Sequence, residues 1–199
     1  MDGGNGDDTL TSTGEDPAVS LTDGPGDDIV RGGPTQDVFT VGPGDNTIIG
    51  SVEPRCPDDF CDLITLQHAR VVDLQDGYVQ TARFRTTLQN IHKVVVSIDG
   101  THTVILRGSE AADMFSGCCM PSQSSAPLVL LGRQGNDSLI GGGGDDRLSG
   151  NGGRDHLRGR FGQDHLTGGS GDDVLDGGPG ELDQCVDDLG ANTFRRCEQ

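Results

Sequence analysis

The stretch from Gly132 to Cys185 reads GRQGNDSLI, GGGGDDRLS, GNGGRDHLR, GRFGQDHLT, GGSGDDVLD and GGPGELDQC, a nine-residue phrase repeated in register. Glycine holds the first and fourth places of the phrase. Aspartate holds the sixth place of the first five phrases, at Asp137, Asp146, Asp155, Asp164 and Asp173. Leucine holds their eighth place, at Leu139, Leu148, Leu157, Leu166 and Leu175. A fixed period of this length predicts a solenoid of stacked units.

The same phrase occurs near the N-terminus of the chain. It reads GGNGDDTLT from Gly3, DGPGDDIVR from Asp23, GGPTQDVFT from Gly32 and VGPGDNTII from Val41. The sixth places of these copies are Asp8, Asp28, Asp37 and Asn46. A degenerate copy, GSEAADMFS, begins at Gly108. The repeat is therefore expected in two blocks rather than one.

Each place of the phrase has a physical role. The glycine-rich half suits a tight turn with positive φ and close backbone approach, which a Cβ would obstruct. The last three places alternate as a minimal strand, with the eighth-place side chain pointing inward. Turn, strand, turn and strand make one coil of 18 residues, so Asp137, Asp155 and Asp173 form one column. Asp146 and Asp164 form the opposite column.

These columns of aspartates predict a divalent cation between successive coils. Stacked strands lie about 4.7–4.9 Å apart, and calcium takes oxygen ligands at about 2.3–2.6 Å, so an ion fits between neighbouring turns. Without a cation, two such carboxylates repel by about 3 kcal/mol at an effective dielectric constant near 20. Repeating that repulsion along two columns would be a poor way to stabilise a fold that holds no metal.

Two other interpretations of the glycine-rich runs are weaker. A flexible linker or disordered tract has no reason to keep aspartate and leucine in strict register through five consecutive phrases. A phosphate-binding loop over Gly141 to Gly144 lacks both the Gly-Lys-Ser/Thr sequence and a following helical pattern. Disorder without calcium and order with it remains compatible with the repeat.

The phrases resemble the RTX, or hemolysin-type, calcium-binding repeat family, whose signature is GGxGxDxUx with a bulky apolar residue at U. The resemblance extends over 3–11, 23–49, 108–116 and 132–176, roughly half of the chain. It implies an all-β fold, a right-handed parallel β-roll or β-helix solenoid with two phrases per coil, which binds several calcium ions. The ligands it implies are the sixth-place residues Asp8, Asp28, Asp37, Asn46, Asp137, Asp146, Asp155, Asp164 and Asp173, and the turn carbonyls of Gly135, Gly144, Gly153, Gly162 and Gly171.

The composition agrees with this interpretation. The net charge is −18, from 27 Asp and 5 Glu against 14 Lys and Arg, and the chain has 33 Gly and no Trp. Aspartate suits turns and short-range cation ligation, whereas an acidic helical surface would favour glutamate. Such a chain is not expected to bind nucleic acid through phosphate contacts or to be attracted to an anionic membrane. It also has no run of 18 apolar residues that would insert as a helix.

The segment from residue 50 to 131 has a different texture. Its apolar runs, such as Val71-Val72 and Val94-Val95-Val96, are strand-length and separated by polar or glycine-containing breaks. We expect irregular parallel β-helix coils here, with a small independent β insertion as the alternative. The predicted organisation is therefore 1–49 (N-terminal repeats), 50–131 (irregular coils), 132–185 (regular β-roll) and 186–199 (C-terminal cap).

Six cysteines, grouped by twos, predict disulfides and an oxidising compartment. Residues 177–198 resemble a closing segment of extracellular RTX-repeat proteins, which implies a Cys185–Cys197 disulfide that pins the end of the solenoid. In that last phrase Leu182 takes the aspartate place and Asp183 follows one residue late. A Cys56–Cys61 bridge is a second candidate, and the pairing of Cys118 and Cys119 stays open. A zinc site is the alternative, but no Cys-x-x-Cys supports it.

No catalytic motif stands out. His-Glu-x-x-His and Gly-x-Ser-x-Gly are both absent, and His156 and His165 take the outward seventh place. We therefore expect a non-catalytic calcium-binding module of an extracellular or cell-surface protein, with an upstream domain or cell-surface material as its partner. The alternative is the C-terminal repeat region of a secreted enzyme, protease-like or lipase-like, or of an adhesin. Met1 precedes an already complete repeat, which favours a fragment of a longer protein.

Overall fold

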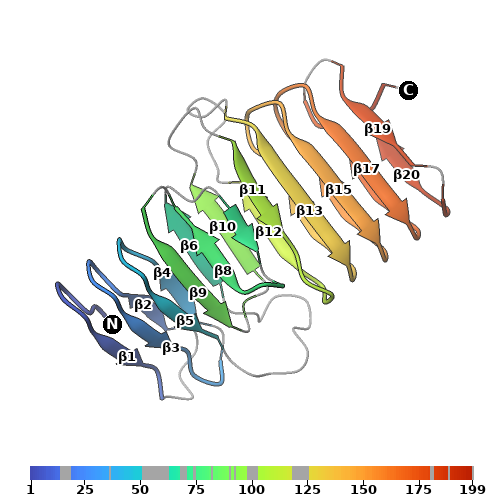
Figure 1. Ribbon diagram of the computed structural model, residues 1–199. Helices are drawn as coiled ribbons and strands as arrows, with labels where there is room; N and C mark the ends of the chain where they lie inside the picture. The colour runs from blue at the N-terminus through green and yellow to red at the C-terminus, as the bar shows by residue number, and fades with distance from the viewer. Residues whose placement is uncertain are drawn as a thin grey trace. The chain divides into compact units, whose positions relative to one another are not determined.

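A computed structural model describes residues 1–13, 19–35, 37–50, 63–67, 71–73, 75–81, 83–89, 91, 93–97, 103–117, 126–179, 182–187 and 189–198. The chain divides into two compact units, Met1–Val95 and Val96–Gln199. Within the described ranges the regular structure is all β-strand (Figure 1). The described ranges contain no helix that is long and apolar enough to cross a bilayer. The candidate pairs Cys56–Cys61 and Cys118–Cys119 lie outside the described residues.

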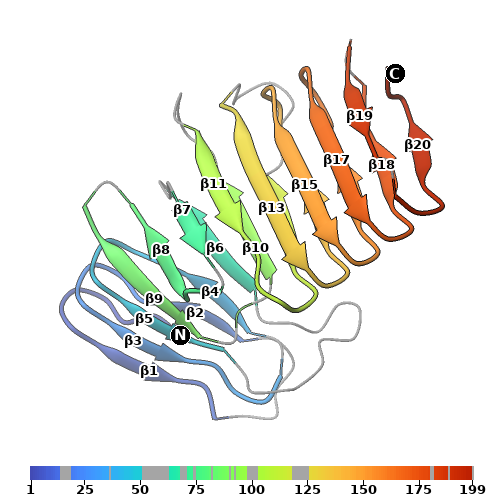
Figure 2. The same ribbon diagram turned by 45° about the vertical axis from the view of Figure 1, so that its right-hand side comes forward.

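The C-terminal unit contains strands of two sheets, and within each sheet these strands run parallel to one another (Figure 2). One sheet contains, in spatial order, β11 (Val104–Arg107), β13 (Leu128–Gln134), β15 (Arg147–Gly152), β17 (His165–Ser170) and β19 (Gln184–Val186). The other contains β12 (Met114–Gly117), β14 (Ser138–Ile140), β16 (His156–Arg158), β18 (Val174–Asp176) and β20 (Thr193–Arg195). Successive strands of the chain thus belong to opposite sheets, as a coil of two phrases requires.

The strand register confirms the predicted coil. Leu139 aligns with Leu157 and Leu157 with Leu175, a step of 18 residues in β14, β16 and β18. Leu148 and Leu166 align in the same way in β15 and β17. All five side chains are at most 2% exposed, because successive side chains of a strand point to opposite faces and these five point inward. The all-β parallel roll expected from the repeat is therefore confirmed.

The described strands β1 to β6 of the N-terminal unit follow the same design. β1 (Thr9–Thr11), β3 (Ile29–Arg31) and β5 (Thr47–Ile49) are parallel neighbours. β2 (Ser20–Thr22), β4 (Val38–Thr40) and β6 (Leu63–Gln67) are parallel neighbours in the second sheet. The eighth-place residues Leu10, Val30, Phe39 and Ile48 are buried in these strands, as the phrase predicts.

Part of the middle segment differs from the expected parallel coils. β7 (Val71–Asp73), β8 (Tyr78–Gln80) and β9 (Arg85–Gln89) form an antiparallel meander. Both connections reverse the chain locally: Gly77 has φ +66°, and the N–H of Thr81 donates to the carbonyl of Phe84 at 3.0 Å. Connections this short join antiparallel strands, whereas a parallel pair needs a longer crossover. β10 (Lys93–Ser97) spans the division between the two units.

The C-terminal segment, predicted from the sequence to be a cap, contains one further copy of the nine-residue phrase. Residues 187–195, DDLGANTFR, place β20 beside β18, with Phe194 aligned to Leu175 at a step of 19 residues. The extra residue lies in the preceding phrase, where Leu182 adopts φ +72°. Gly190 takes the fourth place and Asn192 the sixth. What we expected to be a cap thus begins as a coil.

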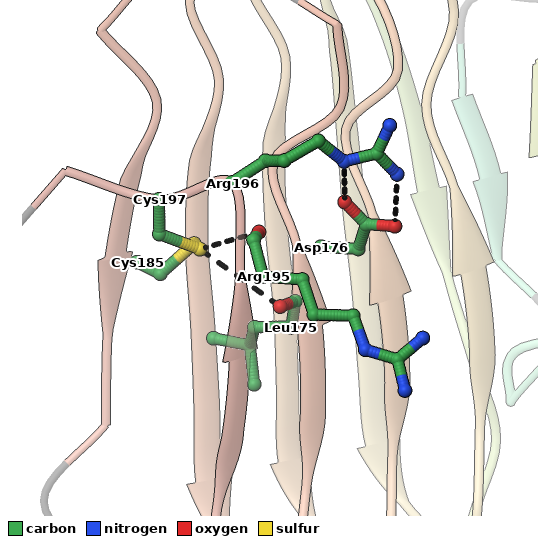
Figure 3. A network of polar contacts seen from close by, with 6 residues as sticks. All are labelled: Leu175, Asp176, Cys185, Arg195, Arg196 and Cys197. Carbon is green, nitrogen blue, oxygen red and sulfur yellow. Dashed lines mark hydrogen bonds and ion pairs between the residues drawn. A yellow bond between two sulfur atoms is a disulfide. The ribbon is translucent and has the colours of Figure 1, made fainter.

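The predicted Cys185–Cys197 disulfide is confirmed, with the two Cα atoms 5.5 Å apart (Figure 3). It links Cys185 in β19 to Cys197, two residues after the end of β20. Beside it, Arg196 Nε donates to Asp176 Oδ1 at 2.8 Å, and this hydrogen bond lowers the pKa of Asp176. These contacts tie the final residues to the last complete coil.

Candidate metal centre

The sixth-place carboxylates of the C-terminal unit form a hydrogen-bonded column along the turns. Each Oδ1 atom accepts the backbone N–H of the sixth-place residue one coil earlier. Asp155 accepts from Asp137 at 2.8 Å, and Asp173 accepts from Asp155 at 2.7 Å. The degenerate copy extends the column at one end, where the Asp113 N–H donates to Asp137 at 2.8 Å, and Asn192 extends it at the other.

The opposite column follows the same rule. Asp164 Oδ1 accepts from the Asp146 N–H at 2.9 Å, and Asp146 Oδ1 accepts from the Leu128 N–H at 2.7 Å. In the last phrase it is Asp183, not Leu182, that accepts from the Asp164 N–H at 2.9 Å. The positive φ of Leu182 takes up the extra residue, so the late aspartate still reaches the column position.

The N-terminal unit repeats this arrangement. Asp28 Oδ1 accepts from the Asp8 N–H at 2.8 Å, and Asn46 Oδ1 accepts from the Asp28 N–H at 2.9 Å. Asp37 Oδ1 accepts from the Val19 N–H at 3.3 Å. Asp8, Asp28 and Asn46 are thus brought into one column, and Asp37 takes the equivalent position beside Val19 in the other sheet.

The second carboxylate oxygen of most of these residues is buried without a hydrogen-bond partner among the described residues. These Oδ2 atoms belong to the sixth-place residues Asp8, Asp28, Asp137, Asp155, Asp164 and Asp173, and to two others, Asp23 and Asp187. A buried polar atom left unpaired is costly, and a buried unpaired charge more so. By contrast, Asp146 Oδ2 accepts the Gly142 N–H, and Asp37 Oδ2 accepts the Gly33 N–H, both at 2.6 Å.

The first-place glycines explain why these oxygens have room. A Cβ built on Gly132, Gly150 or Gly159 would overlap the Oδ2 atom of the sixth-place aspartate in the same phrase. The Cβ position of Gly159 is also 2.5 Å from the carbonyl oxygen of Gly177, the first-place glycine one coil later. An unpaired carboxylate oxygen and a carbonyl oxygen thus border one space that only glycine leaves open. This donor set fits calcium, which binds carboxylate and carbonyl oxygens.

The fourth-place glycines have a different role in the described geometry. Gly153 has φ +125°, and a Cβ there would overlap the carbonyl oxygen of Gly135 in the preceding coil. Gly171 approaches the carbonyl of Gly153, and Gly162 that of Gly144, in the same way. Glycine is required here because the carbonyl oxygen of the preceding coil lies where a Cβ would be, and because φ is positive. That these carbonyls bind calcium remains a prediction.

Burial and mutual repulsion raise the pKa of the sixth-place aspartates of the C-terminal unit. Burial, followed by the neighbouring carboxylates, raises the pKa of Asp137 to about 7 and that of Asp164 to about 7. Burial likewise raises the pKa of Asp146 and of Asp155 to about 6. Asp173 is shifted in the same direction, by burial and by the carboxylate of Asp187. A bound divalent cation would reverse these shifts by favouring the ionised forms.

A second set of hydrogen bonds between successive coils, which was not predicted from the sequence, runs along the fifth places of the phrases. There an exposed Asp or Asn side chain accepts the N–H of the fifth-place residue one coil later. Asp7 accepts from Asp27 at 2.9 Å, and Asn136 accepts from Arg154 at 2.8 Å. The recurrence of Asp or Asn at this place, at Asp7, Asp27, Asp45, Asn136, Asp145 and Asp172, was the available signal.

Side chains of other metal-binding types do not gather at these turns. In the part of the chain that the structure describes, no group of three or more His, Cys, Asp or Glu side chains is placed so that these side chains alone could hold a metal ion. His156 is exposed, and the half-buried His165 places Nδ1 at 3.3 Å from Gln184 Oε1. Beside Gly132 and Gly159, the oxygen that borders the space next to the unpaired Oδ2 is instead a backbone carbonyl.

Comparison with known families agrees with this geometry. The family model described as the RTX calcium-binding nonapeptide repeat (4 copies) matches residues 20–51, 129–157 and 149–181. No curated protein matches the chain. The matched residues contain Asp28, Asp37 and Asn46 in one unit and the sixth-place aspartates from Asp137 to Asp173 in the other. The chain therefore carries RTX (hemolysin-type) calcium-binding repeats, arranged in two blocks.

Proposed function

We propose that this chain is a calcium-dependent structural module of an extracellular protein, in which ions bound between successive turns hold the coils together. The observation that carries the proposal is the set of buried Oδ2 atoms without hydrogen-bond partners among the described residues. Those of Asp8, Asp137 and Asp164 lie where a first-place glycine leaves space beside a backbone carbonyl. A cation in that space would compensate the charge that burial otherwise disfavours.

The proposed ligands are the sixth-place oxygens, together with turn carbonyls. In the C-terminal unit they come from Asp137, Asp146, Asp155, Asp164 and Asp173, with carbonyls of the turns that contain Gly135, Gly144, Gly153, Gly162 and Gly171. In the N-terminal unit they come from Asp8, Asp28, Asp37 and Asn46. Flexible carbonyl-rich turns favour calcium over magnesium, which demands tight octahedral geometry and retains its waters.

Export is supported by two independent features. RTX-repeat proteins are typically secreted, and the Cys185–Cys197 disulfide is of a kind that persists in oxidising compartments. We propose 1–49 and 132–185 as the calcium-binding blocks, 50–131 as the region between them and 186–199 as the closing segment. The module supplies rigidity on calcium binding rather than catalysis.

The second candidate function is that of a repeat region within a larger secreted enzyme or adhesin. The resemblance to RTX proteins supports it, since that family has protease and lipase members. In that case calcium would still order these coils, and the activity would belong to another domain. The complete open reading frame discriminates between the two candidates.

The direct test is circular dichroism during a calcium titration, with magnesium as the ionic control. Asp155→Asn separates the cation from the hydrogen-bond column, because an amide retains an Oδ1 acceptor for the Asp137 N–H but removes the negative charge. Asp172→Asn is the matched control, since it makes the same change at an exposed fifth place. We expect Asp155→Asn to raise the calcium midpoint and Asp172→Asn to leave it unchanged. Identical spectra and unfolding curves in calcium and in chelator would contradict the proposed function.

A further inference from the structure

The last phrase of the chain carries an aspartate at the first place, where the regular phrases of the C-terminal unit carry glycine. The register of β17 and β19 aligns Leu166 with Cys185 and Thr167 with Val186, so Asp187 follows as the counterpart of Gly168. A bridge between Ser170 and Leu189 continues the same alignment. Asp187 therefore occupies a first place, and its side chain enters the row of spaces that first-place glycines leave open elsewhere.

The carboxylate of Asp187 converges with a second carboxylate at this position. A Cβ built on Gly168 would overlap Asp187 Oδ2 and would lie 2.6 Å from Asp173 Oδ2. Both oxygens are buried and have no hydrogen-bond partner among the described residues. The Asp173 residue is only 1% exposed, and its other oxygen already accepts the Asp155 N–H. The two unpaired oxygens thus border one space, whereas the spaces beside Gly150 and Gly159 receive the carboxylate of their own phrase.

We propose that Asp173 and Asp187 form an additional calcium site at the C-terminal end of the stack, with one more carboxylate than the sites between regular coils. This inference rests on the proposed function, because it assigns an ion of the same kind to a position outside the recognised repeats. Calcium affinity increases with the number of charged ligands and with the rigidity of the site. The site is therefore expected to bind more tightly than its neighbours.

The surrounding contacts hold the second carboxylate in place. Asn192, five residues after Asp187, accepts the Asp173 N–H at 2.8 Å, which fixes the last turn against the preceding coil. The Cys185–Cys197 disulfide closes the loop that contains Asp187 and Asn192. A ligand that is restrained before binding loses less conformational freedom when the ion arrives.

Calorimetric calcium titration of the full oxidised chain tests the inference. Asp187→Asn removes the charge, and Asp187→Gly restores the glycine of the regular phrase, so at least one of them should retain the fold. Glu198→Gln is the matched control, because it removes one exposed carboxylate from the same segment. Circular dichroism in saturating calcium verifies that each variant is folded.

We expect both Asp187 variants to bind one tight calcium ion fewer than wild type, or to bind it at least about tenfold more weakly. Glu198→Gln should titrate as wild type does. A wild-type chain that binds calcium, combined with Asp187 variants of unchanged stoichiometry and affinity, would overturn the inference and leave the proposed function intact. That result would mean that the two carboxylates share a proton instead. A wild-type chain that binds no calcium would overturn both.

Discussion

The meander β7–β9 and the coils β13–β18 use similar strands but close their turns in different ways. Val79 and Leu157 are the buried central residues of three-residue strands, at 1% and 0% exposure. In the meander, the turn between β8 and β9 is closed by its own residues: Thr81 Oγ1 accepts the Phe84 N–H at 2.9 Å. In the coils, a turn is closed by a side chain 18 residues away, as when Asp155 accepts the Asp137 N–H.

This difference has an energetic consequence. A turn closed by local hydrogen bonds is satisfied by the segment that forms it. Most coil turns, such as those of Asp137, Asp155 and Asp164, also bury a carboxylate oxygen that no described group pairs, and stacking the coils brings those carboxylates into columns. The meander is therefore expected to be stable without a ligand, and the coils to depend on one.

Calcium removal should produce the largest difference between the two regions. We expect backbone amides of β13–β18 to lose most of their hydrogen-exchange protection in chelator and to regain it in calcium, since the ions bind only the folded turns. Amides of β7–β9 should keep a larger share of their protection. Hydrogen exchange followed by mass spectrometry resolves the two sets of peptides. Equal loss in both regions would contradict the comparison.

Removal of the terminal disulfide should have the next largest effect, confined to one end of the C-terminal unit. The double substitution Cys185→Ser and Cys197→Ser is preferable to a reductant because it spares the other cysteines. The entropy model gives about 3 kcal/mol for a loop of this size. We expect the coil containing β19 and β20 to exchange faster and to need more calcium to fold. Unchanged protection of residues 184–195 would show that the disulfide does not stabilise the last coil.

A single methyl group should distinguish the calcium space from the rest of a turn. In Gly150→Ala the new Cβ would overlap the Asp155 carboxylate, whereas in Gly152→Ala it would lie 2.8 Å from Gln134 Oε1, at the end of a flexible side chain. Overpacking of this kind costs about 1–3 kcal/mol. We expect Gly150→Ala to raise the calcium midpoint clearly and Gly152→Ala to change it little. The opposite ranking would argue against the assignment of the first-place space.

The smallest expected effect is a pH dependence that calcium removes. The pKa values of Asp137 and Asp164 are raised to about 7 in the fold, so the calcium-free coils bind protons that the unfolded chain releases above about pH 4. Their stability should fall as the pH rises from about 4 to 7. In saturating calcium the carboxylates stay ionised, so neither the folded nor the unfolded chain binds these protons above about pH 4 and stability should vary little over the same range.

Thermal unfolding at pH 5 and pH 8, with and without calcium, checks this difference. Tyr78, the one tyrosine of a chain without tryptophan, lies in β8 and reports on the meander by fluorescence. The coil signal in circular dichroism should depend on pH in chelator and hardly at all in saturating calcium, and the Tyr78 signal should show this difference weakly. A coil signal with the same pH dependence in both conditions would contradict the role assigned to the carboxylate columns.

Much of the regular architecture could be predicted because the same residue types recur at the same places of many successive phrases. The period of nine gave the coil, the eighth place gave the buried row, and the sixth place gave the columns, from Asp137 to Asp173. The fifth-place pattern was visible in the sequence as well, but exposed Asp and Asn are so common in turns that their recurrence was not distinctive.

The sequence by itself determined the solenoid, its two-phrase coil and the residues that face its interior, because these depend on alternation and turn chemistry within one phrase. Only the tertiary structure decided the antiparallel path of residues 71–89, the substitution of Asp183 for Leu182, and the meeting of Asp173 with Asp187. The chain reverses direction in the first case, and one extra residue shifts the strand register in the other two. The residue that each side chain contacts then depends on its pairing with the neighbouring strand, which the local sequence does not determine.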